Sequence, residues 1–419
     1  MPRAQGAAGP GGPRRTRPSR VWRRRPGRPA AKRNAARRLS AGQPTRAGGG
    51  AMRPCQTSRQ TRQCGYGCSR LLAAAGQGSS MVRIGIIGIG FMGKTHWDAA
   101  QQVSGGEVTA VCTRSEKKLS GDWSDIQGNF GGPGGQVDLS DTRKYRAVDD
   151  ILADPDIDLV DICLPTALHK EVTIAAFEAG KHVLLEKPIA VQLADADEMV
   201  AAANASGRKF FVGQVLRFFP EFDFIKRALD SGEYGALKGA NFKRIISSPS
   251  WGENWFANLP QSGGPGIDLH IHDSDFIVYI LGVPDSVYSS GILIEGEYAQ
   301  YIATHYAYEE LGVTLTAQSG AIAHGGRPFE HGFDVYFENA TVQYNSSWGS
   351  PLCVVTPDGV EEPELSAEDG FVREIQYAVD TIANDTEPTL LSGQSARDSL
   401  ALCWREVESA RTGSVVRLK

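Results

Sequence analysis

The sequence contains no hydrophobic run long enough to cross a membrane, since none approaches the roughly 20 apolar residues that a spanning helix needs. Its seven cysteines form no disulfide framework: Cys55, Cys64 and Cys68 lie in a basic segment, whereas Cys112 and Cys163 lie in apolar runs, where cysteine is usually a packing residue. These absences exclude a spanning helix and a disulfide-stapled secreted fold. We therefore expect a soluble, cytoplasmic protein.

Acidic residues are absent from the first 80 positions, which hold 17 Arg and one Lys, so all 48 Asp and Glu residues follow them. We expect residues 1–80 to be disordered, because they show no apolar periodicity and cannot bury enough surface to offset backbone ordering. Three interpretations remain open: a nucleic-acid-binding arm, a transit peptide, and translated sequence upstream of a native start at Met81. We favour the last, because a strong strand pattern follows Met81. An exported twin-arginine signal is excluded, since no apolar stretch follows "RRLS".

Short apolar runs alternate with helical patterns after Met81. Strands are expected at 82–88, 107–113, 158–165, 181–186 and 209–215, and helices at 93–103, 169–180 and 193–207. Continuous apolar strands that alternate with helices predict a parallel sheet covered on both faces. The polar, Gly-rich segment 120–141 is interpreted as a loop insertion.

The rhythm changes after about residue 216. A helix at 221–232 precedes expected strands at 237–247, 286–296, 298–309, 312–324 and 333–347, and helices at about 370–384 and 393–411 close the chain. Sequential strands with short turns favour a largely antiparallel sheet. The predicted fold class is α/β, with a parallel-sheet domain at 81–215 and a C-terminal α+β domain at 216–419 that carries an open, largely antiparallel sheet.

The sequence "GIGFMG" follows the first expected strand and opens the first helix. In G-x-G-x-x-G, the first glycine permits a tight turn, the second admits a pyrophosphate, and the third lets helix and strand pack closely. The helix N-terminus offers N–H groups and partial positive charge to phosphate. Residues 81–215 are therefore interpreted as a dinucleotide-binding Rossmann domain. The cofactor-binding residues expected here are Gly88, Ile89, Gly90, Phe91, Met92 and Gly93.

The second strand ends in "VCTRSEKK", without the acidic residue that would bind the ribose hydroxyl of NAD. Arg114 and Ser115, after Thr113, can instead hold a 2′-phosphate, because a guanidinium pairs with phosphate through two hydrogen bonds. The alternative is that Arg114 is simply a solvated residue. NADP is the expected cofactor, with NAD as the second possibility.

The next two strand ends also carry polar residues. Pro165, Thr166 and His169 lie at the carboxyl end of the third expected strand, and Glu186 and Lys187 at that of the fourth. Ligands of an open α/β sheet bind at the carboxyl ends of its strands, so we expect these residues, like Thr113, Arg114 and Ser115, to bind the cofactor in one crevice. Lys187 beside a nicotinamide could share a proton with a substrate hydroxyl.

Four motifs in this order, "GIIGIGFMG", "DICLPTALHKE", "HVLLEKPIA" and "GGPGIDLHIHDSD", resemble the glucose–fructose oxidoreductase / inositol dehydrogenase (Gfo/Idh/MocA) family over essentially all of 81–419. The resemblance implies a Rossmann domain paired with a second domain whose open sheet often forms oligomer contacts. It also implies oxidation or reduction of sugars and polyols with NAD or NADP. By position, Lys187, Asp268 and His272 match the catalytic residues of the family. His270 stands where many members have glycine, and its role is left open.

The stretch "GGPGIDLHIHDSD" permits two interpretations. As a strand it would place Asp268, His270 and His272 on one face, as a metal site requires; as a helix it would place Asp268, His272 and Asp275 together. The preceding "GGPG" and the long apolar continuation favour the helix, as does the resemblance. We therefore predict no metal. His272 is the expected acid/base, Asp268 orients it or binds substrate, and Asp275 is structural.

The predicted function is hydride transfer between nicotinamide and a sugar, polyol or related hydroxy or keto compound. The expected substrate-binding residues are Lys187, Gln214, Arg217, Trp251, Trp255, Asp268 and His272, because aromatic faces with amide and charged donors suit polyhydroxylated ligands. An NAD-dependent glycosidase and a non-catalytic dinucleotide sensor are the alternatives. A homodimer or homotetramer is expected, with neither a membrane nor a nucleic-acid partner.

Overall fold

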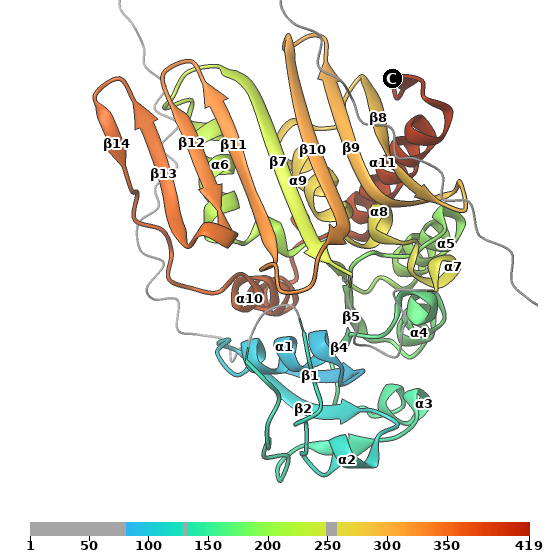
Figure 1. Ribbon diagram of the computed structural model, residues 1–419. Coiled ribbons are helices and arrows are strands. Elements are labelled where there is room, and N and C mark those ends of the chain that lie inside the picture. Colours follow the sequence, from blue (N-terminus) through green and yellow to red (C-terminus); the bar gives the residue numbers. More distant parts are fainter. Residues whose placement is uncertain (1–80, 129–131, 249–257) are drawn as a thin grey trace, which may run out of the picture. The chain divides into compact units, whose positions relative to one another are not determined.

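The computed structural model describes residues 81–128, 132–248 and 258–419 (Figure 1). These residues belong to one compact unit, Ala75–Lys419. The extension expected at 1–80 and the predicted substrate residues Trp251 and Trp255 lie outside the described residues. Among the described helices, none is long and apolar enough to cross a membrane.

Six parallel strands form the first sheet, in the order β3-β2-β1-β4-β5-β6. They are β1 (Val82–Ile87), β2 (Gly106–Cys112), β3 (Arg143–Tyr145), β4 (Leu159–Ile162), β5 (His182–Glu186) and β6 (Phe210–Gly213). The helices between them are α1 (Phe91–Ala100), α2 (Glu116–Leu119), α3 (Val148–Leu152), η1 (Thr166–Leu168), α4 (His169–Glu178) and α5 (Leu193–Ser206). The predicted parallel Rossmann sheet is confirmed. The strand order reverses between β1 and β4, and ligands of such sheets bind at that point.

Strand β3 and helices α2 and α3 were not expected from the sequence. The three residues of β3 are polar or half-buried and pair only with the edge strand β2, so they carry no apolar run. The described parts of the expected loop insertion, 120–128 and 132–141, contain only an isolated bridge between Asp122 and Gln136.

Nine strands form the second sheet, in the order β14-β13-β12-β11-β7-β10-β9-β8-β15. They are β7 (Leu237–Ser247), β8 (Ser286–Ile294), β9 (Tyr298–Tyr308), β10 (Val313–Ala323), β11 (Glu330–Phe337), β12 (Thr341–Asn345), β13 (Ser350–Thr356), β14 (Gly359–Glu361) and β15 (Val416–Arg417). Only β7 and β10 pair in parallel, so the expected largely antiparallel sheet is confirmed. The single strand expected at 333–347 is wrong: it is a hairpin of β11 and β12, closed where the Phe337 amide donates to the Ala340 carbonyl.

The remaining helices are η2 (Val215–Arg217), α6 (Pro220–Ser231), α7 (Leu259–Ser262), α8 (Pro265–Asp268), α9 (Ile271–Leu281), η4 (Ser346–Trp348), α10 (Gly370–Ala383) and α11 (Gly393–Thr412). Figure 1 shows α6 and α9 behind the second sheet, while α10 contacts α1 and α11 contacts α5. The last helices of the chain therefore return to the parallel sheet. The boundary between residues 215 and 216 stays a prediction, because 75–419 form a single compact unit.

The stretch around His270 is helical, as the sequence favoured, but it forms two helices rather than one. Helix α8 ends at Asp268, and α9 begins at Ile271 with His270 as its N-cap. The His270 amide reaches back to the Pro265 carbonyl at 3.0 Å, five residues earlier, which is a wider turn than an α-helix uses. The expected single helix, which would place Asp268, His272 and Asp275 on one face, is therefore wrong.

Candidate active site

A cavity of about 510 Å³ lies at the carboxyl ends of the parallel strands. At the strand ends of the first sheet and in the segments that follow them it is lined by Gly90, Met92, Pro165, Thr166, Glu186 and Lys187, and from the rest of the chain by Arg244, Asp268, His272, Phe329, His331 and Phe371. Residues from the glycine loop, two strand ends, helices α8 and α9 and the second sheet thus share one cavity.

The glycine loop fits a dinucleotide by its shape. Gly88 has φ +98°, and a Cβ there would lie 2.6 Å from the Cys163 carbonyl oxygen. A Cβ at Gly93 would lie 2.0 Å from the Gly88 carbonyl oxygen, whereas one at Gly90 would meet no atom within 4 Å. Gly88 and Gly93 therefore hold strand and helix together, and Gly90 leaves an opening. Helix α1 has no acidic residue in its first turn, so its N-terminus suits phosphate.

The segment from the end of β2 to α2 lies next to the glycine loop and contributes two cations, Arg114 and Lys118. The Thr113 hydroxyl accepts from the Ser115 amide at 3.3 Å, and the Ser115 hydroxyl accepts from the Lys118 amide, which caps α2. Arg114 is exposed. Lys118, which the sequence reasoning missed, donates from Nζ to the Ile89 carbonyl at 2.6 Å. Its charge therefore lies at the glycine loop, and the signal for it was the "EKK" that follows Ser115.

His169 lies behind the cavity rather than in its lining. Its Nδ1 is 2.9 Å from the Pro188 carbonyl oxygen and its Nε2 is 2.8 Å from the Leu164 carbonyl oxygen. Burial lowers the pKa of His169. The ring therefore joins the loops that follow β4 and β5, while Pro165 and Thr166 reach the cavity itself.

Lys187 and Asp268 meet across the cavity. The Lys187 Nζ donates to the Asp268 backbone carbonyl at 2.8 Å and lies 3.3 Å from its Oδ1. Both side chains are mostly buried, with exposed fractions of 16% and 18%. The lysine comes from the end of β5 and the aspartate from the end of α8, so this contact joins the two halves of the site.

His272 lines the same cavity and is neutral at neutral pH. Burial lowers its pKa well below 6.5, and the charges of Lys187 and Arg244 and the neighbouring His331 lower it further. Its Nδ1 is buried without a hydrogen-bond partner among the described residues. A neutral imidazole beside an ammonium group can accept a proton from a bound hydroxyl.

Two predicted substrate residues do not line the cavity. Arg217 is buried, with Nε 2.9 Å from Asp275 Oδ2, Nη2 2.5 Å from Asp275 Oδ1 and a further contact to the Leu390 carbonyl. Gln214 is also buried, and neither of its side-chain polar atoms has a partner among the described residues. Asp275 is thus a structural partner of Arg217, in a pair that holds η2 against α9.

His270 belongs to a buried network beneath the second sheet. Its Nδ1 lies 2.7 Å from the Ser319 hydroxyl, and its Nε2 lies 3.2 Å from the Tyr306 hydroxyl and 3.1 Å from Glu406 Oε2. Asp273 binds Arg244 at 3.0 Å and accepts from Ser319. The polar residues of "GGPGIDLHIHDSD" therefore divide among separate contacts, with Asp268 and His272 in the cavity. The network places Arg244, another residue the sequence reasoning missed, in the cavity wall.

A buried cluster of ionisable groups lies under the strand ends. His96 on α1 contacts Asp161 on β4 and Glu186 on β5, and the Cys163 thiol lies 3.5 Å from Asp161. The donor atoms of His96, Asp161 and Cys163 are close enough to hold a metal ion. However, both ring nitrogens of His96 already face carboxylates, and burial raises the pKa of the Cys163 thiol, so these contacts suit shared protons better than a metal.

Glu374 on α10 packs against this cluster. It is fully buried, and neither carboxylate oxygen has a partner among the described residues. Burial raises the pKa of Glu374 to about 8, against the opposing charge of His96 and with the help of Glu186 and Asp161. Glu374 is therefore a carboxylic acid at neutral pH, which nothing in its local sequence indicates.

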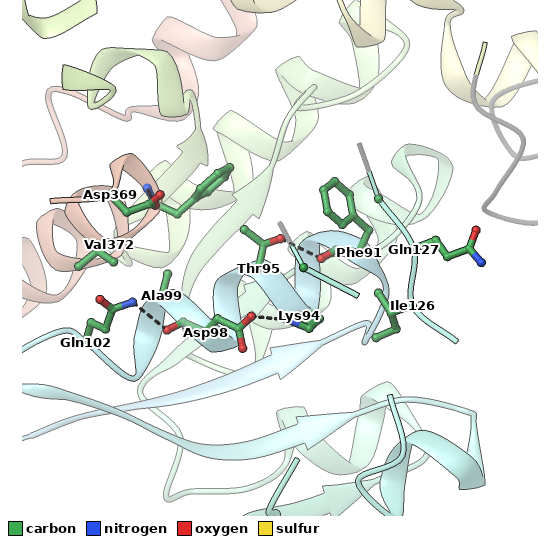
Figure 2. A pocket seen from close by; sticks show the side chains of 13 residues that line it. Phe91, Lys94, Thr95, Asp98, Ala99, Gln102, Ile126, Gln127, Asp369 and Val372 are labelled. Atoms are coloured by element: carbon green, nitrogen blue, oxygen red, sulfur yellow. Dashed lines mark hydrogen bonds and ion pairs between the residues drawn. The ribbon is translucent and has the colours of Figure 1, made fainter. Parts of the chain in front are cut away.

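A smaller pocket of about 290 Å³ runs along the outer face of α1 (Figure 2). Lys94 and Asp98 pair on the helix, and Gln127 and Asp369 border the pocket from the neighbouring loop and from the start of α10. Asp369 is also part of the larger cavity's lining. The pocket is thus a side extension next to the glycine loop.

Fold and cavity together define a class of protein, the oxidoreductases with a NAD-binding Rossmann fold. The model of the oxidoreductase family with this fold matches residues 82–214, and the model of the GFO/IDH/MocA C-terminal domain matches residues 222–343. The chain belongs to the GFO/IDH/MocA oxidoreductase family.

Proteins of related sequence align with most of the chain. An oxidoreductase of Bacillus subtilis is 31% identical over 259 residues, which span 60% of this chain and 68% of the relative. The 1,5-anhydro-D-fructose reductase of Ensifer adhaerens is 27% identical and covers 81% of this chain and 99% of its own length. The myo-inositol 2-dehydrogenase of Thermotoga maritima is 28% identical, with the same coverage of 81% and 99%.

Solved structures share the fold. Levoglucosan dehydrogenase in complex with NADH has a TM-score of 0.68 at 19% identity and covers 81% of this chain and 99% of that chain. An oxidoreductase from Agrobacterium radiobacter in complex with NAD+, L-tartaric acid and magnesium has a TM-score of 0.65 at 21% identity, with coverage of 80% and 98%. At these identities the likeness concerns the fold.

Proposed function

We propose that this protein transfers hydride between a nicotinamide dinucleotide, preferably NADP, and a CH–OH or C=O group of a sugar, polyol or related compound. One observation carries the proposal: Lys187, Asp268 and His272 line the same cavity as the open backbone at Gly90. A hydride acceptor must reach the substrate carbon while a proton-handling group reaches the oxygen on that carbon, and this cavity offers room for both.

In the oxidative direction, the residues act on a hydroxyl whose carbon loses hydride. The nicotinamide supplies the hydride acceptor when bound. The neutral His272 accepts the hydroxyl proton while the C=O bond forms, and the Lys187 ammonium stabilises the negative charge that develops on the oxygen. Asp268 holds Lys187 in place through its carbonyl and carboxylate. In the reductive direction, the same groups return the proton to the carbonyl oxygen.

The preference for NADP is supported by cations near the β2 tip. A 2′-phosphate carries charge that Arg114 can pair with by two hydrogen bonds. Lys118, with Nζ at the Ile89 carbonyl, adds a second cation from the same turn. No acidic residue stands in "TRSEKK" before Glu116, whose carboxylate pairs with Arg146 instead.

The substrate class is supported by the cavity wall opposite the glycine loop. Arg244 and His331 are cross-strand neighbours on β7 and β11 and line the cavity with the Phe329 ring. Guanidinium and imidazole donors beside an aromatic face suit a polyhydroxylated ligand. The anhydrofructose and inositol named for two relatives are compounds of this kind. Trp251 and Trp255 stay in the proposal as substrate contacts.

A screen of inositols, anhydrosugars and aldoses, each with NAD and NADP in both directions, tests the proposal. We expect a net change in nicotinamide absorbance with at least one compound, and a lower KM for NADP than for NAD. Turnover of a glycoside without net change in absorbance would favour the glycosidase alternative, because its cofactor is regenerated. Dinucleotide binding without any turnover would favour a sensor.

We further propose a homodimer or homotetramer in the cytoplasm. Large apolar side chains are exposed on β8, β10 and β11 of the second sheet: Tyr288, Ile292, Ile322 and Tyr336. Exposed apolar groups gathered on one sheet often mark contacts between copies. Light scattering on the parent and on a Tyr288→Lys/Ile292→Lys variant tests the assembly, since a monomeric parent would contradict it. Cell fractionation tests the location.

A further inference from the structure

The His96 ring bridges two strand ends of the parallel sheet. Its Nδ1 lies 2.8 Å from Asp161 Oδ2, and its Nε2 lies 2.9 Å from Glu186 Oε1. All three side chains are buried, with exposed fractions of 0% for His96, 1% for Asp161 and 5% for Glu186. The ring therefore ties α1, which begins at the glycine loop, to the ends of β4 and β5 that border the cavity.

The Glu186 carboxylate connects His96 to the backbone of Lys187. One oxygen of the Glu186 carboxylate faces His96, and the other accepts the Lys187 backbone N–H at 3.0 Å. From there the Lys187 side chain extends to Asp268. The contacts thus connect α1, through the buried Glu186 carboxylate, to the backbone of Lys187.

The contacts require a particular charge on His96. A neutral imidazole has one N–H and can donate to only one of two carboxylates, whereas an imidazolium donates to both. Burial lowers the pKa of His96, but the negative charge of Asp161 outweighs it and raises the pKa well above 6.5. Glu374 on α10 is a further ionisable group close to the ring.

Stability alone is a poor account of such a cluster. Burying charged groups costs desolvation, and well-packed apolar side chains of similar volume often stabilise a core as well or better. An imidazolium held between two carboxylates fixes their orientation, because both acceptors bind the same rigid ring. Here it fixes the orientation of the Glu186 carboxylate at the end of β5.

We propose that His96 is a positioning residue for Lys187: as an imidazolium between Asp161 and Glu186, it fixes the Glu186 carboxylate and, through it, the Lys187 ammonium group in the cavity. The link to turnover rests on the proposed function, in which Lys187 acts on the substrate. The positioning itself is a property of the folded chain without any ligand.

Competitive acetylation of lysines tests the positioning without a substrate. The full chain is treated with trace acetic anhydride, and mass spectrometry compares Lys187 with the exposed Lys238 on β7. We expect His96→Gln to raise the acetylation of Lys187 relative to Lys238 by about fivefold or more, because losing charged hydrogen bonds frees the side chain. The exposed His305→Gln serves as the matched control and should leave the ratio unchanged.

Lys181 separates positioning from general loosening. It is buried just before β5, at the other end of the strand that leads to Lys187, and donates to the Asp154 and Ile157 carbonyls at 2.5 and 2.9 Å. If His96 positions Lys187, the His96→Gln variant labels Lys187 faster while Lys181 stays protected. An unchanged Lys187, or a parallel rise of both lysines, would overturn the proposal.

Two further variants keep the test decisive. If His96→Gln does not fold, His96→Gln/Asp161→Asn removes one charge of each sign and should still release Lys187, as should Glu186→Gln. Unchanged labelling in both would refute the positioning. The outcome is independent of turnover: full activity of Lys187→Met would refute the proposed function and leave the labelling result standing.

Discussion

The Lys187 Nζ lies 2.8 Å from the Asp268 backbone carbonyl oxygen, although the two residues are 81 positions apart in the chain. This contact brings the end of a parallel strand to the end of a short helix beside the second sheet. The ammonium group is held at a fixed place in a cavity that also contains the neutral His272 imidazole. A fixed cation and a neutral base are complementary groups for moving a proton and stabilising an oxyanion.

Replacing Lys187 with Met should lower turnover by about 10²–10⁴-fold, the range typical for loss of a group that handles a proton. His272→Ala should have an effect of similar size. Cofactor affinity should stay within about threefold, because neither change removes the glycine loop or helix α1. Steady-state kinetics by nicotinamide absorbance and dinucleotide titration by tryptophan fluorescence measure the two effects.

Lys238→Met is the matched control, since Lys238 is exposed on β7 and does not line the cavity. It should retain the kcat and KM of the parent. Parent-like turnover in Lys187→Met or His272→Ala would remove that residue from the mechanism.

Glu374 makes stability depend on pH. Its pKa is raised from 4.5 to about 8 in the folded chain, so between these values the folded state holds a proton that the unfolded state has released. Its contribution to the free energy of unfolding is therefore fully present below pH 4.5 and is lost as pH rises toward 8, by about 1.4 kcal/mol per pH unit. Glu374→Gln, which cannot ionise, should gain in Tm relative to the parent across this window, with a constant difference above it.

Thermal unfolding of parent and variant at several pH values between 4 and 9 measures this difference. The exposed Glu368→Gln, close to the same helix, is the control and should follow the parent at every pH. Parallel Tm curves for Glu374→Gln and the parent would contradict the raised pKa.

The sequence predicted the parallel sheet well, because buried strands such as Phe210–Gly213 are continuous apolar runs and the glycine spacing marks the first turn. It also predicted that Lys187 would follow a strand end. It could not predict that Arg217 is held by a structural contact, because the partner of this side chain, Asp275, lies 58 residues away and no local pattern indicates the pair. Short polar strands such as Arg143–Tyr145 were not predicted, because they become strands by pairing with a neighbouring strand and their own residues carry no strand pattern.

The groups that no motif marks are those whose chemistry depends on burial. Glu374 lies in an amphipathic helix, where an acidic residue is expected on the surface. The structure places it in the core. His96 lies one turn into α1, where its two carboxylate partners come from strands 65 and 90 residues further on. Ionisable groups gain unusual proton affinities from such long-range contacts, which local periodicity does not encode.

Lys118 should contribute to the choice between the two dinucleotides. In Lys118→Met, we expect the Kd for NADPH to rise by about tenfold or more, because a charge-assisted contact to phosphate is lost, and the Kd for NADH to rise much less. Fluorescence titration with both dinucleotides measures the ratio. Lys117→Met is the control, since Lys117 lies near Asp122 and Asp125 on the exposed side of α2. An equal loss of affinity for both dinucleotides would assign Lys118 to the glycine loop alone and not to the 2′-phosphate.

Gly90 and Gly93 should respond to the same substitution in opposite ways. A Cβ at Gly93 would lie 2.0 Å from the Gly88 carbonyl oxygen, so Gly93→Ala should destabilise the fold by several degrees in Tm or prevent folding. A Cβ at Gly90 would meet no atom within 4 Å, so Gly90→Ala should keep the parent's Tm. The same Cβ occupies the backbone opening through which the pyrophosphate would approach, and dinucleotide affinity should therefore fall by about tenfold or more.

Thermal unfolding and dinucleotide titration measure the two effects. The control is Gly325→Ala, because a Cβ at Gly325 also meets nothing within 4 Å and this residue lies outside the cavity lining. Parent-like dinucleotide affinity in Gly90→Ala would show that the dinucleotide does not pass over this loop.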